Sequence, residues 1–147
     1  MKAIKRAGLT HIRIPVGYWL FGDIRDGEPW VAGGVDHLYA ALDWASQQGL
    51  KVVLDVHCGP GSQNGFDNSG KKGALHWNDF AYRADGSKYY PNIDRTVDFL
   101  GTLSDHFASK IWALEILNEP FITIDEGVLK VQSPPLPISR RPPAHAI

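Results

Sequence analysis

Three short apolar runs, separated by two segments with helical spacing, constrain the fold of this chain more than any other feature. They are rich in β-branched and aliphatic residues, as buried strands are. Residues 35–48 and 92–107 instead carry apolar residues at intervals of three and four, which predicts amphipathic helices. The alternation predicts parallel strands joined through helices, an α/β architecture of about three βα units. The three runs are residues 9–15 (LTHIRIP), 50–57 (LKVVLDVH) and 111–118 (IWALEILN).

Turn-forming and capping residues mark where these segments begin and end. Residues 1–7 look like the last turns of a helix, with Gly8 as its stop. We expect Pro15 to end the first strand, Gly49 to end the first long helix and Asn92 to cap the second. Residues 58–91 show no evident regular structure, and a segment of that length is often functional.

Composition excludes several classes of partner. A formal net charge of −1 gives no reason to expect a nucleic acid or an anionic membrane surface. The longest apolar runs are too short to cross a bilayer. Cys58 is the only cysteine, so an internal disulfide is impossible. His57 and Cys58 should face opposite sides of their strand, and no metal or other cofactor is expected.

The C-terminal residues differ in composition from the rest. Residues 132–147 are rich in proline and lack helical or strand periodicity, which indicates a disordered extension. A polyproline ligand for a partner domain is the alternative. We therefore divide the chain into a folded part, residues 1–131, and this tail.

Polar residues stand where each predicted strand ends. Arg13, His57 and the pair Asn118-Glu119 occupy these positions. Carboxyl ends of parallel strands meet at one rim in both barrels and open sheets, so we expect these side chains to lie together. Periodicity alone does not distinguish a closed barrel from an open sheet.

Three blocks carry a resemblance to a known family. Residues 8–19 (GLTHIRIPVGYW), 54–70 (LDVHCGPGSQNGFDNSG) and 115–120 (EILNEP) resemble the fungal exo-1,3-β-glucanases of glycoside hydrolase family 5. The resemblance covers about residues 1–130. It implies part of a (β/α)8 barrel and retaining cleavage of a β-glucan or oligosaccharide. It also implies a monomer and an extracellular or cell-wall location.

The same resemblance implies roles for individual residues. Glu119 would be the acid/base group and Asn118 would hold the 2-hydroxyl of the sugar that is cleaved. Arg13 would lie beside the nucleophile, and His57 would line the cleaving subsite. Apart from the resemblance, we expect the strand that carries Arg13 to be largely buried. The structural alternatives are a barrel-internal ion pair for Arg13 and a turn residue for Asn118. Phe66 and Asp67 are expected to contact sugar, and Tyr18, Trp19 and Trp77 are either walls of the cleft or core.

The chain departs from the family in one respect that matters for activity. The family needs a second catalytic glutamate on a later strand, and only Asp125 and Glu126 follow Glu119. They fall in an expected helix, residues 123–131, and match no nucleophile motif. We expect a truncated barrel that is inactive alone. The alternatives are a non-catalytic carbohydrate-binding protein and an open α/β domain with an unrelated small-molecule function.

Overall fold

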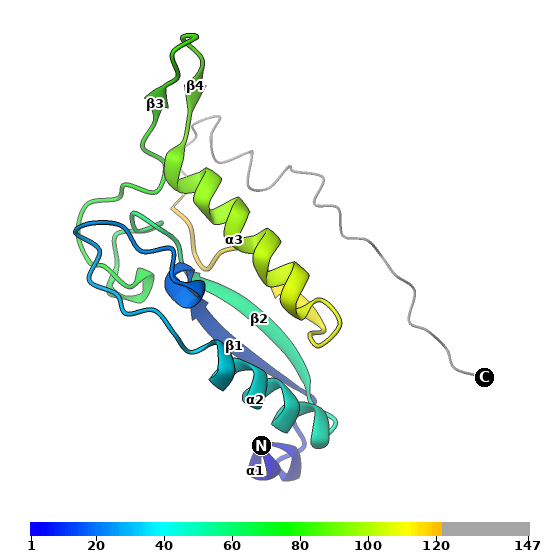
Figure 1. Ribbon diagram of the computed structural model, residues 1–147. Helices are drawn as coiled ribbons and strands as arrows, with labels where there is room; N and C mark the ends of the chain where they lie inside the picture. Colours follow the sequence, from blue (N-terminus) through cyan, green and yellow to red (C-terminus); the bar gives the residue numbers. More distant parts are fainter. Residues whose placement is uncertain (122–147) are drawn as a thin grey trace.

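A parallel sheet of three strands forms the centre of the computed structural model, which describes residues 1–121 (Figure 1). Its order is β1 (His11–Gly17), β2 (Lys51–Cys58) and β5 (Ala113–Glu115). Val53 on β2 aligns with Arg13 on one side and with Ala113 on the other. The prediction of three parallel strands linked through helices is confirmed.

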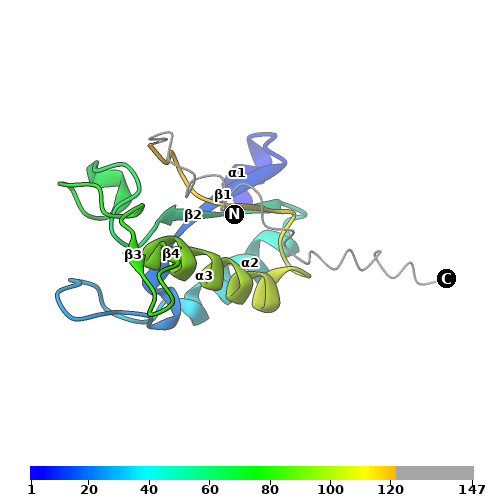
Figure 2. The same ribbon diagram turned by 90° about the horizontal axis from the view of Figure 1, so that it is seen from above.

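Two long helices cover the same face of the sheet. Figure 2 shows α2 (Val35–Gln47) and α3 (Pro91–Phe107) on one side of the strands. The even-numbered residues of β2 point to this side, because side chains alternate along a strand. They are fully or almost fully buried, and with apolar residues of both helices they form the main core. Its central members are Leu38, Leu42, Val52, Leu54, Val56, Leu100, Leu103 and Phe107.

The opposite face of the sheet carries charged side chains. The odd-numbered residues point there, and they include Arg13, Asp55, His57 and Glu115. Among the described residues no layer covers this face, so the Arg13 side chain is 44% exposed. Every residue of β1 is exposed or half-buried, so the expectation that the strand carrying Arg13 is largely buried is wrong for residues 1–121.

Short elements flank this two-layer unit. They are α1 (Lys2–Arg6), the 3-10 turns η1 (Tyr18–Phe21) and η2 (Asp67–Ser69), and the strands β3 (Ala81–Tyr82) and β4 (Lys88–Tyr89). Strands β3 and β4 pair in antiparallel fashion and extend past the N-terminal end of α3 (Figure 1). The interpretation of residues 58–91 as a loop without regular structure is thus wrong in part.

The expected bounds of β1, β5 and α3 are also wrong. Strand β1 continues through Pro15 to Gly17, because β1 is an edge strand of the described sheet and proline is tolerated at an edge. Strand β5 covers only three residues of the expected eight. Asn92 does not cap α3: Pro91 begins the helix after Tyr90, as its fixed φ favours, and the Asn92 amide donates to the carbonyl of His76 at 3.0 Å.

A nearly buried arginine fastens the segment after η1 to α3. Arg95 is 6% exposed, and its guanidinium donates to Asp23 and Glu28 at 2.8 Å each. It also lies 5.0 Å from the ring centroid of Tyr18. Burial of a guanidinium is tolerated only with such partners, so Arg95 fixes the path of residues 22–28.

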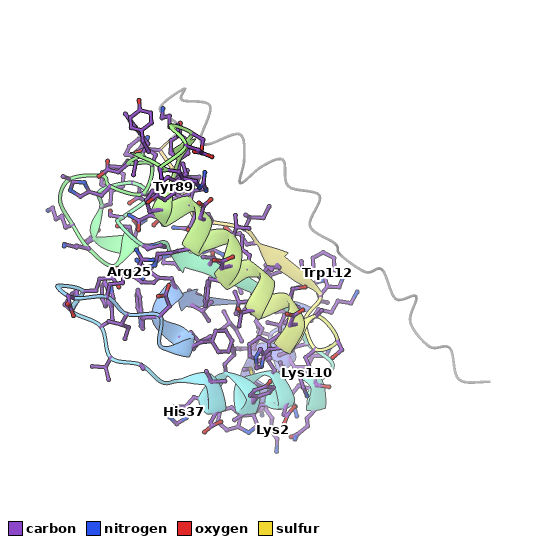
Figure 3. The ribbon with its side chains drawn as sticks, turned by 45° about the horizontal axis from the view of Figure 1, so that its top comes forward. Lys2, Arg25, His37, Tyr89, Lys110 and Trp112 are labelled. Carbon is purple, nitrogen blue, oxygen red and sulfur yellow. The ribbon has the colours of Figure 1, made fainter. Side chains whose placement is uncertain are left out.

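An apolar hollow of about 330 Å³ lies between the end of α3 and β5, and is lined by residues such as Leu100, Ile111 and Leu114. Trp112, which also lines it, is 60% exposed and projects outward in Figure 3. Within residues 1–121 neither β1 nor β5 has a further strand neighbour.

No helix in this range is long and apolar enough to span a membrane. The helix expected at 123–131 and the tail at 132–147 lie outside the described residues.

Candidate active site

Arg13 links the three strands on the face of the sheet opposite α2 and α3. Its Nε donates to Glu115 Oε2 at 2.7 Å, and its Nη2 donates to Glu115 Oε1 at 2.8 Å. The same Nη2 donates to Asn118 Oδ1 at 2.8 Å and lies 3.1 Å from Asp55 Oδ2. The hydrogen bond with Glu115 is the main reason that the pKa of Arg13 is raised and that of Glu115 lowered.

Asp55 and His57 form a second pair on this face, two residues apart on β2. The side chain of Asp55 is completely buried, and its Oδ2 lies 2.8 Å from His57 Nδ1. Burial raises the pKa of Asp55, and the negative charge of Glu115 adds to this, while His57 and Arg13 oppose it. This network joins the predicted site residues Arg13 and His57 through a carboxylate that we did not predict.

The bond from Arg13 also fixes the orientation of the Asn118 side chain. Since Asn118 Oδ1 accepts from Arg13, its Nδ2 must face the other way. That Nδ2 is buried and has no acceptor among the described residues. A buried donor without an acceptor costs roughly 1–3 kcal/mol, so a ligand oxygen at this position would be stabilising.

The loop after β2 holds the segment that contains Glu119. Gln63, fully buried, donates from Nε2 to the carbonyls of His57 at 2.8 Å and Asn118 at 3.0 Å. Asn64 Nδ2 donates to the carbonyl of Glu119 at 3.1 Å. The loop thus ties the ends of β2 and the β5 segment to each other.

Glu119 itself is exposed and contacts the same loop. Its Oε2 accepts a hydrogen bond from Asn68 Nδ2 at 2.9 Å. Its backbone has a φ of 42°, the left-handed region that non-glycine residues seldom adopt. Such strain persists only where neighbours enforce it, and the hydrogen bond from Asn64 to the Glu119 carbonyl does so here.

Two exposed aromatic rings belong to the segments that this hydrogen bond joins: Phe66 lies two residues before Asn68, and Phe121 two residues after Glu119. Phe66 and Phe121 are 51% and 50% exposed, and their centroids are 5.2 Å apart. Exposed rings so placed can stack against the apolar face of a sugar. Asp67, the neighbour of Phe66, accepts from the backbone N–H of Asn68 at 3.1 Å, a local contact that does not join it to Arg13 or His57.

The other candidate aromatics belong to the packing of the chain. Trp77 is 1% exposed and donates to Thr96 at 3.0 Å, and Tyr18 is 4% exposed. Trp19 stacks on Trp30 with centroids 4.0 Å apart. For Trp77 and Tyr18 the structure favours the core alternative over the wall of a cleft.

Sequence reasoning missed the carboxylates Asp55 and Glu115 and the amides Gln63, Asn64 and Asn68. All but Glu115 lie inside the second of the three motif blocks, and Glu115 opens the third. For Asp55 a signal was available, because residues two apart on a strand share a face and Asp55 therefore accompanies His57. Arg13, His57 and Asn118 are brought together as predicted, and Glu119 follows Asn118 directly.

The sequence of the chain matches a known protein family and several curated proteins. A family model described as "Cellulase (glycosyl hydrolase family 5)" matches residues 1–132. A "Probable glucan 1,3-beta-glucosidase" of Arthroderma benhamiae is 46% identical over 121 residues, 80% of this chain and 27% of that protein. A "Glucan 1,3-beta-glucosidase" of Pichia angusta is 41% identical over 125 residues, 81% of this chain and 26% of that protein.

Solved structures agree on the fold. The rutinosidase of Aspergillus niger superimposes with a TM-score of 0.63 at 20% identity, over 81% of this chain and 32% of that one. This supports the predicted α/β class, part of a (β/α)8 barrel in which helices cover the outer face of the strands. The chain spans about a quarter of the length of the curated relatives that it matches.

Proposed function

The chain belongs to glycosyl hydrolase family 5, and we propose that it contributes the acid/base half of an active site that cleaves β-glucan with retention of configuration. The observation that carries this proposal is the hydrogen-bonded group of Arg13, Asp55, His57 and Asn118 at neighbouring strands, with Glu119 next in sequence. The relatives that match it are described as glucan 1,3-beta-glucosidases.

Glu119 is the proposed proton donor to the departing sugar oxygen, and afterwards the base for the incoming water. Its exposed position next to Asn68 leaves it accessible to a substrate. Asn118 Nδ2, which lacks an acceptor among residues 1–121, is the proposed donor to the 2-hydroxyl. A hydrogen bond at that hydroxyl strengthens in the oxocarbenium-like transition state.

The proposed nucleophile is a carboxylate that this chain does not supply, since Asp125 and Glu126, the carboxylates after Glu119, match no nucleophile motif. Retaining enzymes need two carboxyl groups about 5 Å apart. Glu115 is bound by Arg13 through two hydrogen bonds, and Asp55 is completely buried. Neither is available to attack a sugar, so we expect the 147-residue chain to be inactive alone.

The proposed hydrolase function also suggests a substrate and a cellular location. Phe66 and Phe121 provide an aromatic surface beside Glu119 that suits a glucosyl unit next to the cleaved bond. A β-1,3-glucan is the proposed substrate, and an extracellular or cell-wall site is the proposed location. A non-catalytic carbohydrate-binding protein is the second candidate, favoured by the absence of an available nucleophile among residues 1–121.

A chimera tests the proposal. Residues 1–121 replace the matching segment of the Arthroderma benhamiae relative, and glucose release from laminarin is measured. Glu119→Gln should lower kcat about 10²–10⁴-fold, yet spare the glycosylation of an activated aryl glucoside whose leaving group needs no proton. The control is Asp98→Asn. Asp98 is exposed and belongs to α3, on the side of the sheet opposite the candidate site. Unchanged laminarin turnover in Glu119→Gln would remove Glu119 from the mechanism.

The 147-residue chain and the chimera together distinguish a hydrolase from a carbohydrate-binding protein. The 147-residue chain is titrated with laminari-oligosaccharides by calorimetry. Binding by this chain, together with a chimera that folds but releases no glucose, would favour the carbohydrate-binding protein. Hydrolysis by the chimera that depends on Glu119 favours the hydrolase.

A further inference from the structure

Among residues 1–121, Asp55 is the one carboxylate on the sheet face opposite the helices whose side chain has no exposed surface, and the proposed reaction gives it no task. Its side chain is 0% exposed, although its neighbours Arg13, Glu115 and His57 are 44%, 35% and 27% exposed. A buried carboxylate is costly unless donors surround it. A role for Asp55 must therefore lie in what it holds.

The hydrogen atoms around Asp55 can be assigned from the contacts. Arg13 Nη2 carries two, and it donates them to Glu115 Oε1 and Asn118 Oδ1, so its 3.1 Å approach to Asp55 is an ion pair alone. Asp55 Oδ1 has no partner among residues 1–121. The hydrogen bond at Asp55 is thus the 2.8 Å contact between Oδ2 and His57 Nδ1. A proton on Oδ2 would face the guanidinium, so Oδ2 accepts and Nδ1 donates.

We propose that Asp55 is a positioning residue that keeps His57 in the Nδ1-protonated tautomer and leaves Nε2 as the nitrogen that meets the sugar. In a neutral ring, Nε2 then accepts a hydrogen bond, so it selects a sugar hydroxyl that donates one. The hydrogen bond also fixes the plane of the ring. The identity of the ligand at Nε2 rests on the proposed function, whereas the tautomer does not.

A second histidine–aspartate pair in the chain shows the same contact without burial. His76 Nδ1 lies 2.8 Å from Asp79 Oδ2, the same distance as in the Asp55–His57 pair. The two side chains of that pair are 58% and 63% exposed. Water competes for both partners there, and exposed pairs contribute little. His76 should therefore show mixed tautomers where His57 shows one.

Nitrogen-15 NMR of the histidine rings in the 147-residue chain tests the proposal without sugar. At about pH 8, where an ordinary histidine is neutral, His57 Nδ1 should give a shift of the protonated type and Nε2 a shift of the unprotonated type. His76 should give averaged shifts. A protonated-type shift at His57 Nε2 in the unaltered chain would overturn the proposal, and this measurement needs no variant.

Variants separate the positioning role from general support of the fold. Asp55→Ala removes the acceptor, so the two His57 shifts should move toward each other or exchange. Asp55→Asn should restore the original pattern, because its amide oxygen can take the place of Oδ2. Glu115→Gln disturbs Arg13 but not the His57 bond and should leave the pattern unchanged. Equal shifts in Asp55→Ala and Glu115→Gln would show that His57 does not depend on Asp55.

Sugar is added last. Laminaribiose should move the His57 Nε2 shift more than the Nδ1 shift. If the tautomer follows Asp55 as described but laminaribiose moves neither shift, the positioning role stands and the sugar as ligand fails.

Discussion

Arg13 on β1 and Glu115 on β5 are joined by two hydrogen bonds of 2.7 and 2.8 Å that pass over β2, although 102 positions separate them. The pair therefore connects the first and last strands of the described sheet. The pKa of Glu115 is lowered, chiefly by the hydrogen bond from Arg13. A carboxyl group of this kind stabilises the folded state above its ordinary pKa, and this contribution is lost as the pH falls through its lower, folded-state pKa.

Glu115→Gln should therefore reduce stability near neutral pH and leave the chain less sensitive to acid. Both partners are about a third or more exposed, and solvent screening limits the expected loss to about 1 kcal/mol. The free energy of unfolding in urea, measured at pH 7 and again below pH 4, gives the comparison. Parallel pH profiles for the two proteins would contradict the assignment.

Arg95→Met should be the more destabilising of two arginine substitutions that each remove an ion pair formed by a residue of α3. It leaves Glu28 and Asp23 without their partner and should cost about 2–4 kcal/mol, discounted because Asp23 is 55% exposed. Arg83→Met is the control, since its 3.8 Å pair with Asp94 is exposed on both sides and should be worth less than about 1 kcal/mol. Urea unfolding measures both. Equal losses would mean that Arg95 does not anchor residues 22–28.

Gly61→Ala should cost more than Gly8→Ala, although both glycines have φ near 80°. Left-handed backbone alone costs an alanine about 1–2 kcal/mol. At Gly61 a Cβ would also lie 2.8 Å from the backbone of His76, whereas at Gly8 it meets nothing within 4 Å. Overpacking adds about 1–3 kcal/mol. Thermal unfolding of the two variants should show this difference, and similar melting temperatures would refute it.

Cys58 should be inert while the chain is folded. Burial raises the pKa of its thiol to about 11, so at pH 8 only about a thousandth is thiolate, the reactive form. Modification by a chromogenic disulfide such as DTNB should be slow in buffer and rapid in guanidinium chloride. Rapid reaction of the folded chain at pH 8 would show that the thiol is accessible.

The sequence permits prediction of the sheet because its strands carry continuous apolar runs, and buried parallel strands require such runs. Residues 50–57 and β2 differ by one position at each end. The hairpin β3–β4 was not predicted, since strands of two residues leave no periodicity. Asn92 was misassigned because a proline at the first helical position competes with a cap one residue later.

The candidate site was predicted by position but not by its contacts. The predicted strand ends and the motif blocks identified four candidate residues: Arg13, His57, Asn118 and Glu119. The partners of Arg13 depend on a contact across 102 positions, which no local pattern contains. The exposure of Arg13 could not be anticipated either, because it depends on which layers cover the face of the sheet. The catalytic and binding roles of these residues remain predictions.

Glu119 combines a left-handed backbone with the proposed role of proton donor, so stability and turnover would favour different residues at this position. Glycine adopts a φ of 42° without steric cost, so its substitution for Glu119 would relax the loop. Under that proposal, a library of the chimera scored for abundance or heat resistance would enrich replacements that a screen for glucan hydrolysis discards.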